Sequence, residues 1–182
     1  MKNVLLGVTG SIAAYKAAEI TRLLVKRGFS VRVIMTKSAE RFISPLTFQS
    51  LTKHKVYTDL FEDVFYEDIR HISLAKGAAI AVVAPATANI IGKLASGVAD
   101  DMLSTVLTAM AADKPILICP AMNTAMWENP AVQHNVKKLK SYGVLFAEPK
   151  ESELVCGDTG KGALADTDSI VNAVVSLLDG KP

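Results

Sequence analysis

The stretch that decides the fold is VLLGVTGSIAAYKAAEITRLLVKRGFSVRVIM, residues 4–35. It opens with the apolar run Val4–Val8, which stops at Thr9–Ser11 as a buried strand does. Apolar residues then recur at helical spacing up to Leu24, and Gly28 follows where a helix is expected to end. Ser30–Met35 alternates apolar and polar residues, which is typical of a second strand. This order predicts a strand, a crossover helix and a parallel strand.

The same alternation continues along the chain. Further strands are predicted at Ile80–Ala84, which Pro85 ends, at Pro115–Cys119 and at Val144–Ala147. Helices are predicted at Pro45–Leu51, His71–Lys76, Thr87–Ala95, Asp100–Ala112, Asn129–Tyr142 and Ser169–Leu178. This pattern predicts an α/β fold in one domain over residues 1–182: a doubly wound, flavodoxin- or Rossmann-like parallel sheet with helices on both faces. The long connection Glu148–Asp168 is the exception, and loops of this length are usually functional.

Composition and charge argue against several classes of partner. The net charge is +2, from 20 basic and 18 acidic residues, so neither nucleic acid nor an anionic membrane is expected. Half of the 182 residues are apolar, which is enough for a substantial core. The two cysteines, Cys119 and Cys156, lie far apart with no metal-ligand spacing, so we expect no metal site and no disulfide framework. With no signal sequence and no apolar run of about 18–20 residues, the chain is expected to be cytoplasmic.

The ends of the first two predicted strands indicate a mononucleotide. Ligands bind open parallel sheets at the carboxyl ends of the strands. The segment GVTGSIAAYK, residues 7–16, matches neither the dinucleotide pattern nor a P-loop, and Thr36–Ser38 stands where a dinucleotide site would have an acidic residue. Backbone N–H groups at Gly10 and Ser11 suit a single phosphate, as in FMN. The alternative is that Ser11 and Ser38 only cap their helices.

The next two strand ends suit a flat ring. Ala84–Asn89 is built of small residues that let a planar ring approach the backbone, and its hydroxyl and amide can bond the ring's polar edge. The octapeptide PAMNTAMW, Pro120–Trp127, carries amide and apolar side chains and no charge. An N-cap at Thr87 and simple core packing by methionine and tryptophan are the competing interpretations. Strand ends that lack carboxylates but are rich in amides and hydroxyls favour chemistry done by a bound cofactor.

Few side chains remain for proton chemistry. His71 begins a helical turn, and a lone histidine is more often structural than catalytic. Cys156 lies near glycines in the long connection and is predicted to be a thiol delivered to a substrate, with Lys161 placed to attract an anion. The alternative is a glycine-rich turn with an incidental thiol. Cys119, inside a predicted strand, is interpreted as inert packing.

Five motifs carry a family resemblance, and they occur in this order: GSIAAYK (10–16), HISLAK (71–76), APATAN (84–89), PAMNTAMW (120–127) and CGDTGKG (156–162). Along nearly the whole chain they resemble the homo-oligomeric flavin-containing cysteine decarboxylases. The octapeptide is highly specific to that family. The resemblance is strongest to the members that convert 4'-phosphopantothenoylcysteine to 4'-phosphopantetheine in coenzyme A biosynthesis. It implies FMN, oxidation of the cysteinyl side chain to a thioaldehyde, loss of CO2 and re-reduction.

The resemblance also implies roles for individual residues. FMN would be held at its phosphate end by Gly10, Ser11, Ile12, Thr36 and Ser38. Its ring would be lined by Thr87, Ala88, Asn89, Ile90 and Ala121. The catalytic set would comprise His71 as the active-site histidine, Asn123 on the substrate carboxylate and Cys156 as proton donor. Met126 and Lys161 are expected at the substrate, under a flap over about residues 149–168. Homotrimers or dodecamers are implied, with His71 acting across a subunit interface.

Some features depart from the family pattern. Cys119 stands where alanine is expected, and Ala79 stands where aspartate is frequent, but neither touches a predicted catalytic group. Many bacterial members carry a fused synthetase that joins cysteine to phosphopantothenate. The sequence ends at Pro182, which leaves open a free-standing enzyme with a separate phosphopantothenate–cysteine ligase or a fragment of a bifunctional protein.

Three other functions compete with this one. A peptidyl-cysteine decarboxylase shares the fold, FMN and the octapeptide, but an enzyme that stops at the enethiol needs no proton from Cys156. A flavin prenyltransferase would want more arginines near its phosphate-rich substrate. A flavin-binding regulator of a phosphatase would typically carry an acidic tail. The phosphopantothenoylcysteine substrate therefore remains the first prediction, and the peptide substrate the second.

Overall fold

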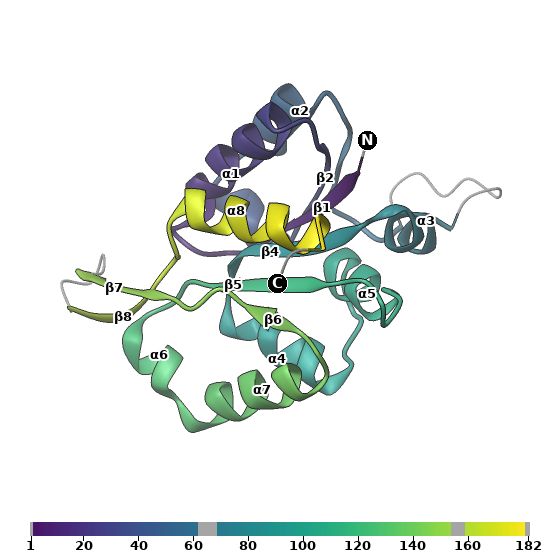
Figure 1. Ribbon diagram of the computed structural model, residues 1–182. Helices are drawn as coiled ribbons and strands as arrows, with labels where there is room; N and C mark the ends of the chain where they lie inside the picture. The colour runs from purple at the N-terminus through teal and green to yellow at the C-terminus, as the bar shows by residue number, and fades with distance from the viewer. Residues whose placement is uncertain (1, 62–68, 154–158, 181–182) are drawn as a thin grey trace.

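The computed structural model describes residues 2–61, 69–153 and 159–180 (Figure 1). Within these residues the main sheet has six strands, all parallel, in the order β3-β2-β1-β4-β5-β6. The strands are β1 (Asn3–Val8), β2 (Ser30–Met35), β3 (Val56–Tyr57), β4 (Ile80–Ala86), β5 (Ile116–Pro120) and β6 (Leu145–Phe146). The predicted parallel α/β sheet is confirmed. The two-residue strand β3 was not predicted.

Helices cover both faces of this sheet (Figure 1). One face carries α1 (Ala14–Lys26), α2 (Pro45–Thr52) and α8 (Thr167–Leu178). The other carries α3 (Arg70–Gly77), α4 (Ala88–Ser96), α5 (Met102–Thr108) and α7 (Pro130–Ser141). The short helix α6 (Thr124–Glu128) follows β5, and the 3-10 turn η1 (Ala39–Arg41) follows β2. No described helix is long and apolar enough to cross a bilayer.

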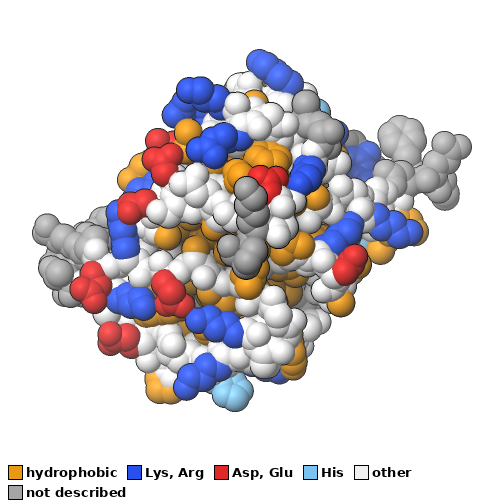
Figure 2. Space-filling model, viewed as in Figure 1, with side chains coloured by type: hydrophobic (Ala, Val, Ile, Leu, Met, Phe, Trp, Pro, Cys, Tyr) orange, Lys and Arg blue, Asp and Glu red, His pale blue; other side chains and the backbone are white. Residues whose placement is uncertain are grey.

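The apolar runs in the central strands follow from burial on both faces. Successive side chains of a strand point to opposite sides of the sheet. In β1, Leu6 therefore packs with α1 and α8, whereas Leu5 packs in the core formed with α4 and α5. Burying such a side chain completely contributes about 1.5–3 kcal/mol. On the outside, basic and acidic side chains are interspersed over the face shown in Figure 2.

Two predicted boundaries are corrected by the structure. Strand β4 does not end at Pro85: it continues through a cis Ala84–Pro85 peptide to Ala86, which pairs with Pro120 of β5. A shift of register after Val83 accommodates the proline between the two neighbouring strands. Helix α5 does not begin at Asp100, because the Asp101 carboxylate accepts the Ser104 N–H at 2.8 Å and so caps the helix.

The long connection before α8 is not simply a loop. It contains an antiparallel pair, β7 (Lys150–Glu153) and β8 (Thr159–Ala163), separate from the main sheet. Its polar, glycine-rich sequence lacks the apolar alternation that predicts a strand. The predicted flap thus corresponds in part to this hairpin, and residues 154–158 lie outside the described residues.

The order of the strands in the sheet indicates where a ligand-binding crevice is expected. From β1 the chain moves through α1 to β2 on one side, and it later enters β4 on the other side of β1. The order of winding therefore reverses between β1 and β4. In open parallel sheets, such a switch point opens a crevice at the carboxyl ends of the strands.

Candidate active site

A cavity of about 620 Å³ lies at the carboxyl ends of β1, β2 and β4. Its volume falls within the roughly 300–1,000 Å³ typical of cofactor sites, and it lies at the switch point of the sheet. We call it the switch-point cavity. It is lined by Thr9, Gly10, Thr36, Lys37, Ser38, Thr58, Asp59, Leu60, Phe61, Thr87, Ala88, Asn89, Ile90, Lys93, Asp100, Asp101, Met102 and Met126.

Thr9 joins the ends of β1 and β4 beneath this cavity. Its Oγ1 donates a hydrogen bond to the Pro85 carbonyl at 2.7 Å and accepts one from the Thr87 N–H at 3.0 Å. Because Thr9 is buried, these bonds are shielded from water and fix the two strand ends relative to each other. Sequence analysis took Thr9 only as the end of a strand, since nothing in the pattern pairs it with residues about 76 positions away.

The first two strand ends touch at Gly10. A Cβ atom added to Gly10 would lie 2.4 Å from the Ser38 Cβ and 3.1 Å from the Ser38 carbonyl carbon, so only glycine fits. The Ser11 hydroxyl accepts the Ala13 N–H at 3.3 Å in the turn before α1, but the helix has Ala13 at its N-cap and no side-chain capping bond, so the capping alternative is wrong for Ser11. The Ser38 side chain makes no capping bond, and Thr36 Oγ1 accepts the Ala39 N–H instead. Ser38 is exposed at the cavity.

The start of α4 forms the next part of the lining. Thr87, Ala88, Asn89 and Ile90 all line the cavity, as predicted for a ring-binding segment. Thr87 occupies the N-cap position of α4 without a side-chain capping bond, so the capping alternative is wrong for this residue.

Seven of the ten predicted cofactor residues line the cavity. The three that do not are Ser11, Ile12 and Ala121. Ile12 is 55% exposed. Ala121 is buried, and its N–H donates to the Ala86 carbonyl at 3.0 Å. Ala121 therefore connects the ends of β5 and β4 without lining the cavity.

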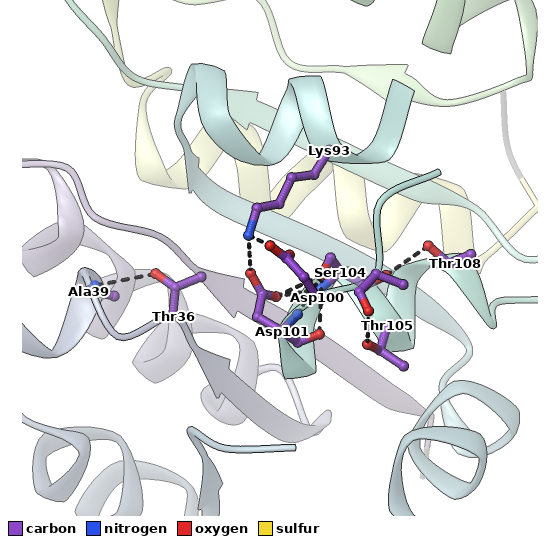
Figure 3. Close-up of polar contacts among 9 residues, drawn as sticks. Thr36, Ala39, Lys93, Asp100, Asp101, Ser104, Thr105 and Thr108 are labelled. Atoms are coloured by element: carbon purple, nitrogen blue, oxygen red, sulfur yellow. Dashed lines mark hydrogen bonds and ion pairs between the residues drawn. The ribbon is translucent and has the colours of Figure 1, made fainter. Parts of the chain in front are cut away.

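A charged network closes the side of the cavity between α4 and α5 (Figure 3). Lys93 Nζ lies 2.6 Å from Asp100 Oδ1 and 2.7 Å from Asp101 Oδ2. Asp101 in turn accepts hydrogen bonds from the backbone and hydroxyl of Ser104 at 2.8 and 2.9 Å. The network ties the end of α4 to the start of α5. Sequence analysis missed it, because only the fold brings Lys93 to carboxylates seven and eight residues later.

The network also perturbs the titration of its members. Burial alone would raise the pKa of Asp101, but hydrogen bonds from Lys93 and Ser104 outweigh burial and lower this pKa below its usual range. Burial likewise opposes the charge on Lys93, whereas the two carboxylates raise its pKa above the usual value. Both groups are thus held charged at neutral pH.

The octapeptide after β5 divides into distinct roles. Asn123 caps α6, its Oδ1 accepting the Ala125 N–H at 2.8 Å. Met126 lines the cavity and is about half-exposed. Trp127 is buried in the core with α4 and α7, so the packing interpretation is confirmed for the tryptophan.

The predicted proton-transfer groups do not meet at this cavity within the described chain. His71 is half-buried on α3 and is not among the cavity residues. Lys161 lies on β8, where its Nζ is 3.1 Å from Glu148 Oε2. Cys156 lies outside the described residues. Cys119 is fully buried and burial raises the pKa of its thiol, as expected for inert packing. Among described side chains, no cluster of three His, Cys, Asp or Glu could hold a metal ion.

A family model and several curated relatives match this chain. The model described as Flavoprotein matches residues 1–179. The "Coenzyme A biosynthesis bifunctional protein CoaBC" of Bacillus subtilis is 53% identical over 170 residues, covering 93% of this chain and 41% of that protein. The "Probable phosphopantothenoylcysteine decarboxylase" of Streptococcus mutans is 46% identical over 177 residues, covering 97% and 99%. The chain therefore spans less than half of the bifunctional relative.

Solved structures share the whole fold. A "PPC decarboxylase" cysteine-to-serine mutant "complexed with pantothenoylaminoethenethiol" matches with a TM-score of 0.91 and 32% identity, covering 98% of both chains. "The FMN binding protein AtHal3" matches with a TM-score of 0.87 and 32% identity, covering 100% of this chain and 98% of that one. The "peptidyl-cysteine decarboxylase EpiD" matches with a TM-score of 0.81 and 27% identity, covering 96% and 99%.

Proposed function

Because this chain belongs to the Flavoprotein family, we propose that it is an FMN-dependent enzyme that decarboxylates 4'-phosphopantothenoylcysteine to 4'-phosphopantetheine. The observation that carries the proposal is the 46% identity to the Streptococcus mutans protein over 99% of that protein's length. A relative with a peptide substrate is 27% identical. Peptidyl-cysteine decarboxylation is therefore the second candidate, and the assay below separates the two.

The switch-point cavity fits FMN in its donor set and its shape. At one end Gly10 and Ser38 approach so closely that a Cβ on Gly10 would clash, and hydroxyls of Thr36 and Ser38 lie beside them. Backbone N–H groups and hydroxyls of this kind suit a phosphate. The adjoining segment Thr87–Ile90 supplies small or apolar side chains and an amide for a planar ring. We assign Gly10, Ser11, Ile12, Thr36 and Ser38 to the phosphate end and Thr87–Ile90 with Ala121 to the ring.

A cysteinyl carboxylate does not lose CO2 readily, because no group accepts the electrons left on carbon. When bound, FMN would supply the redox chemistry that reversibly converts the cysteinyl CH2–SH to C=S, and the C=S group can accept the electrons that CO2 leaves behind. Asn123 would hold the substrate carboxylate through a neutral amide, so no cation opposes departure of CO2. Met126, half-exposed at the cavity, would contact the apolar part of the substrate.

Proton transfer is assigned to His71 and Cys156. His71 would orient and deprotonate the cysteinyl group, and Cys156 would protonate the product. Since His71 does not line the switch-point cavity of its own chain, we assign it to the site of a neighbouring subunit in a homotrimer or a dodecamer. Lys161 would reach an anionic substrate only by leaving Glu148. A phosphopantothenate–cysteine ligase would supply the substrate.

The test is a turnover assay with two substrates. Purified protein with its flavin is mixed with 4'-phosphopantothenoylcysteine or with a peptide that ends in cysteine, and CO2 and products are measured by mass spectrometry. The proposal expects CO2 and phosphopantetheine from the first substrate. If the protein turns over only the peptide, peptidyl-cysteine decarboxylation is the function instead. An absorbance spectrum and the mass of the released flavin check FMN, and the mass of the native assembly checks the oligomer.

A further inference from the structure

Two glycines of the hairpin β7–β8, Gly160 and Gly162, contact the segment Met122–Thr124 that follows β5. Gly162 interrupts the pairing of the hairpin: Lys150 pairs with Ala163 and Glu151 pairs with Lys161, which leaves Gly162 as an unpaired, bulged residue. Its carbonyl instead accepts the Met122 N–H at 2.9 Å. The hairpin is thereby bonded to the segment Met122–Thr124, which carries Asn123.

Neither glycine can be replaced by a larger residue without a steric clash. A Cβ on Gly162 would lie 2.3 Å from the Met122 carbonyl oxygen and 3.3 Å from the Thr124 nitrogen. These are backbone atoms, so they cannot turn aside as a flexible side chain does. A Cβ on Gly160 would lie 2.5 Å from Thr124 Oγ1 and 2.8 Å from Thr124 Cγ2. Thr124 Oγ1 is buried and has no hydrogen-bond partner among the described residues.

Ion pairs connect the hairpin to the residues that flank it. The ammonium of Lys161 pairs with Glu148, which also accepts a hydrogen bond from Lys140 of α7 at 2.9 Å. On the other strand, Lys150 pairs with Asp166.

We propose that Gly160 and Gly162 are positioning residues, which set the register between the hairpin and Asn123. The proposal rests on the proposed function, in which Asn123 holds the substrate carboxylate. Neither glycine lines the cofactor cavity, whereas the atoms that a Cβ on Gly162 would meet belong to Met122, Asn123 and Thr124. A Cβ on Gly162 should therefore displace Asn123 and weaken use of the carboxylate substrate while flavin binding is unchanged.

The first experiment compares Gly162→Ala with Gly77→Ala. Gly77 ends α3, and a Cβ there meets no atom within 4 Å, so this variant is the matched control. The readout is kcat and KM for 4'-phosphopantothenoylcysteine, together with the affinity for FMN measured by fluorescence titration. Gly162→Ala should lower kcat/KM roughly 10- to 100-fold, as expected for misplacement of a positioned group by about 1 Å, with FMN affinity unchanged. An unchanged kcat/KM overturns the proposal.

The second experiment is a rescue. Thr124→Ala removes the two atoms closest to a Cβ on Gly160 and leaves the Thr124 Cβ at 3.2 Å. The Gly160→Ala/Thr124→Ala double variant should therefore recover the kcat/KM that Gly160→Ala loses, whereas Thr124→Ala should not rescue Gly162→Ala. A double variant no better than Gly160→Ala contradicts the assigned contact.

Failure of the proposed function is distinguishable from failure of this proposal. If the unmodified protein makes no phosphopantetheine, the function is wrong, and hydrogen exchange still tests the docking. Gly162→Ala should then speed exchange at the Met122 amide, and Gly77→Ala should not. Equal exchange in the two variants overturns the docking itself.

Discussion

Replacing Lys93 by methionine tests the charged wall between α4 and α5. The Lys93 side chain is only 18% exposed and bonds two carboxylates, at 2.6 and 2.7 Å. Methionine preserves most of the apolar stem and removes the charge, so packing changes little. Asp100 and Asp101 are then left side by side with no cation between them.

The cost follows from the unequal exposure of the two carboxylates. The Asp100 side chain is 58% exposed and regains water, so its bond contributes less than about 1 kcal/mol. Asp101 is 30% exposed and keeps its bonds from Ser104, so it loses one charge-assisted hydrogen bond worth about 1.5–3 kcal/mol. The Lys93→Met variant should lose about 2 kcal/mol of unfolding free energy. For a domain of this size that loss corresponds to a fall in Tm of about 4–8 °C.

The assay is urea unfolding at saturating FMN and a fixed protein concentration. Lys140→Met is the control, because the Lys140–Glu148 pair has a similar length of 2.9 Å but side chains that are 48% and 51% exposed. The control should lose less than about 1 kcal/mol. If Lys93→Met destabilises the protein no more than Lys140→Met, the reasoning about this wall is refuted.

The dependence on pH has a defined sign. The folded pKa of Asp101 is lowered, so its stabilising contribution is present above its unfolded pKa of about 3.9 and is lost as pH falls through the folded value. The folded pKa of Lys93 is raised, so its contribution is present below about pH 10.4 and is lost above it. Between pH 5 and 9 the difference in stability between the unmodified protein and Lys93→Met should be constant. It should shrink outside this window.

Three further predictions concern single residues. Gly10→Ala should weaken FMN binding by at least about tenfold in a fluorescence titration, because its Cβ would lie 2.4 Å from the Ser38 Cβ at the predicted phosphate end. Asn123→Ser keeps a side-chain oxygen for the Ala125 N–H and should retain its Tm, yet raise KM by about tenfold through loss of the amide. Cys119, buried and with a raised thiol pKa, should resist iodoacetamide in the native protein and react after unfolding, as peptide mass spectrometry would show.

The fold could be predicted wherever periodicity extended over several residues. β1, α1 and β2 each show a clear period, and the observed bounds lie within two residues of the predicted ones. β3 and α6 span two and five residues, too few to show a period. The hairpin escaped prediction because it buries almost no apolar side chain of its own, and its contacts are made by glycine backbone.

The part of the site that lies at the strand ends could be predicted from the sequence. Parallel strands bring their carboxyl ends to one edge, so Gly10, Thr36, Ser38 and Thr87–Ile90 were identified from strand position alone. Ile12 shares a motif with Gly10, but its side chain is exposed and does not line the cavity. Thr9 and Lys93 act through partners that the fold brings near them, and no local spacing encodes such a contact.

Gly10 and Gly162 contribute by the space they leave and carry no reactive side-chain atoms. Gly10 lets one strand end touch another, and Gly162 lets the hairpin touch the segment that holds Asn123. A Cβ on Gly10 would lie 2.4 Å from the Ser38 Cβ, and a Cβ on Gly162 would lie 2.3 Å from the Met122 carbonyl oxygen, so any larger residue would push the two segments apart. The chemistry assigned to Asn123 needs groups from different segments held within a fraction of an ångström. A glycine makes such a contact with no side chain to order, whereas fixing a long side chain costs up to about 2 kcal/mol of rotamer entropy.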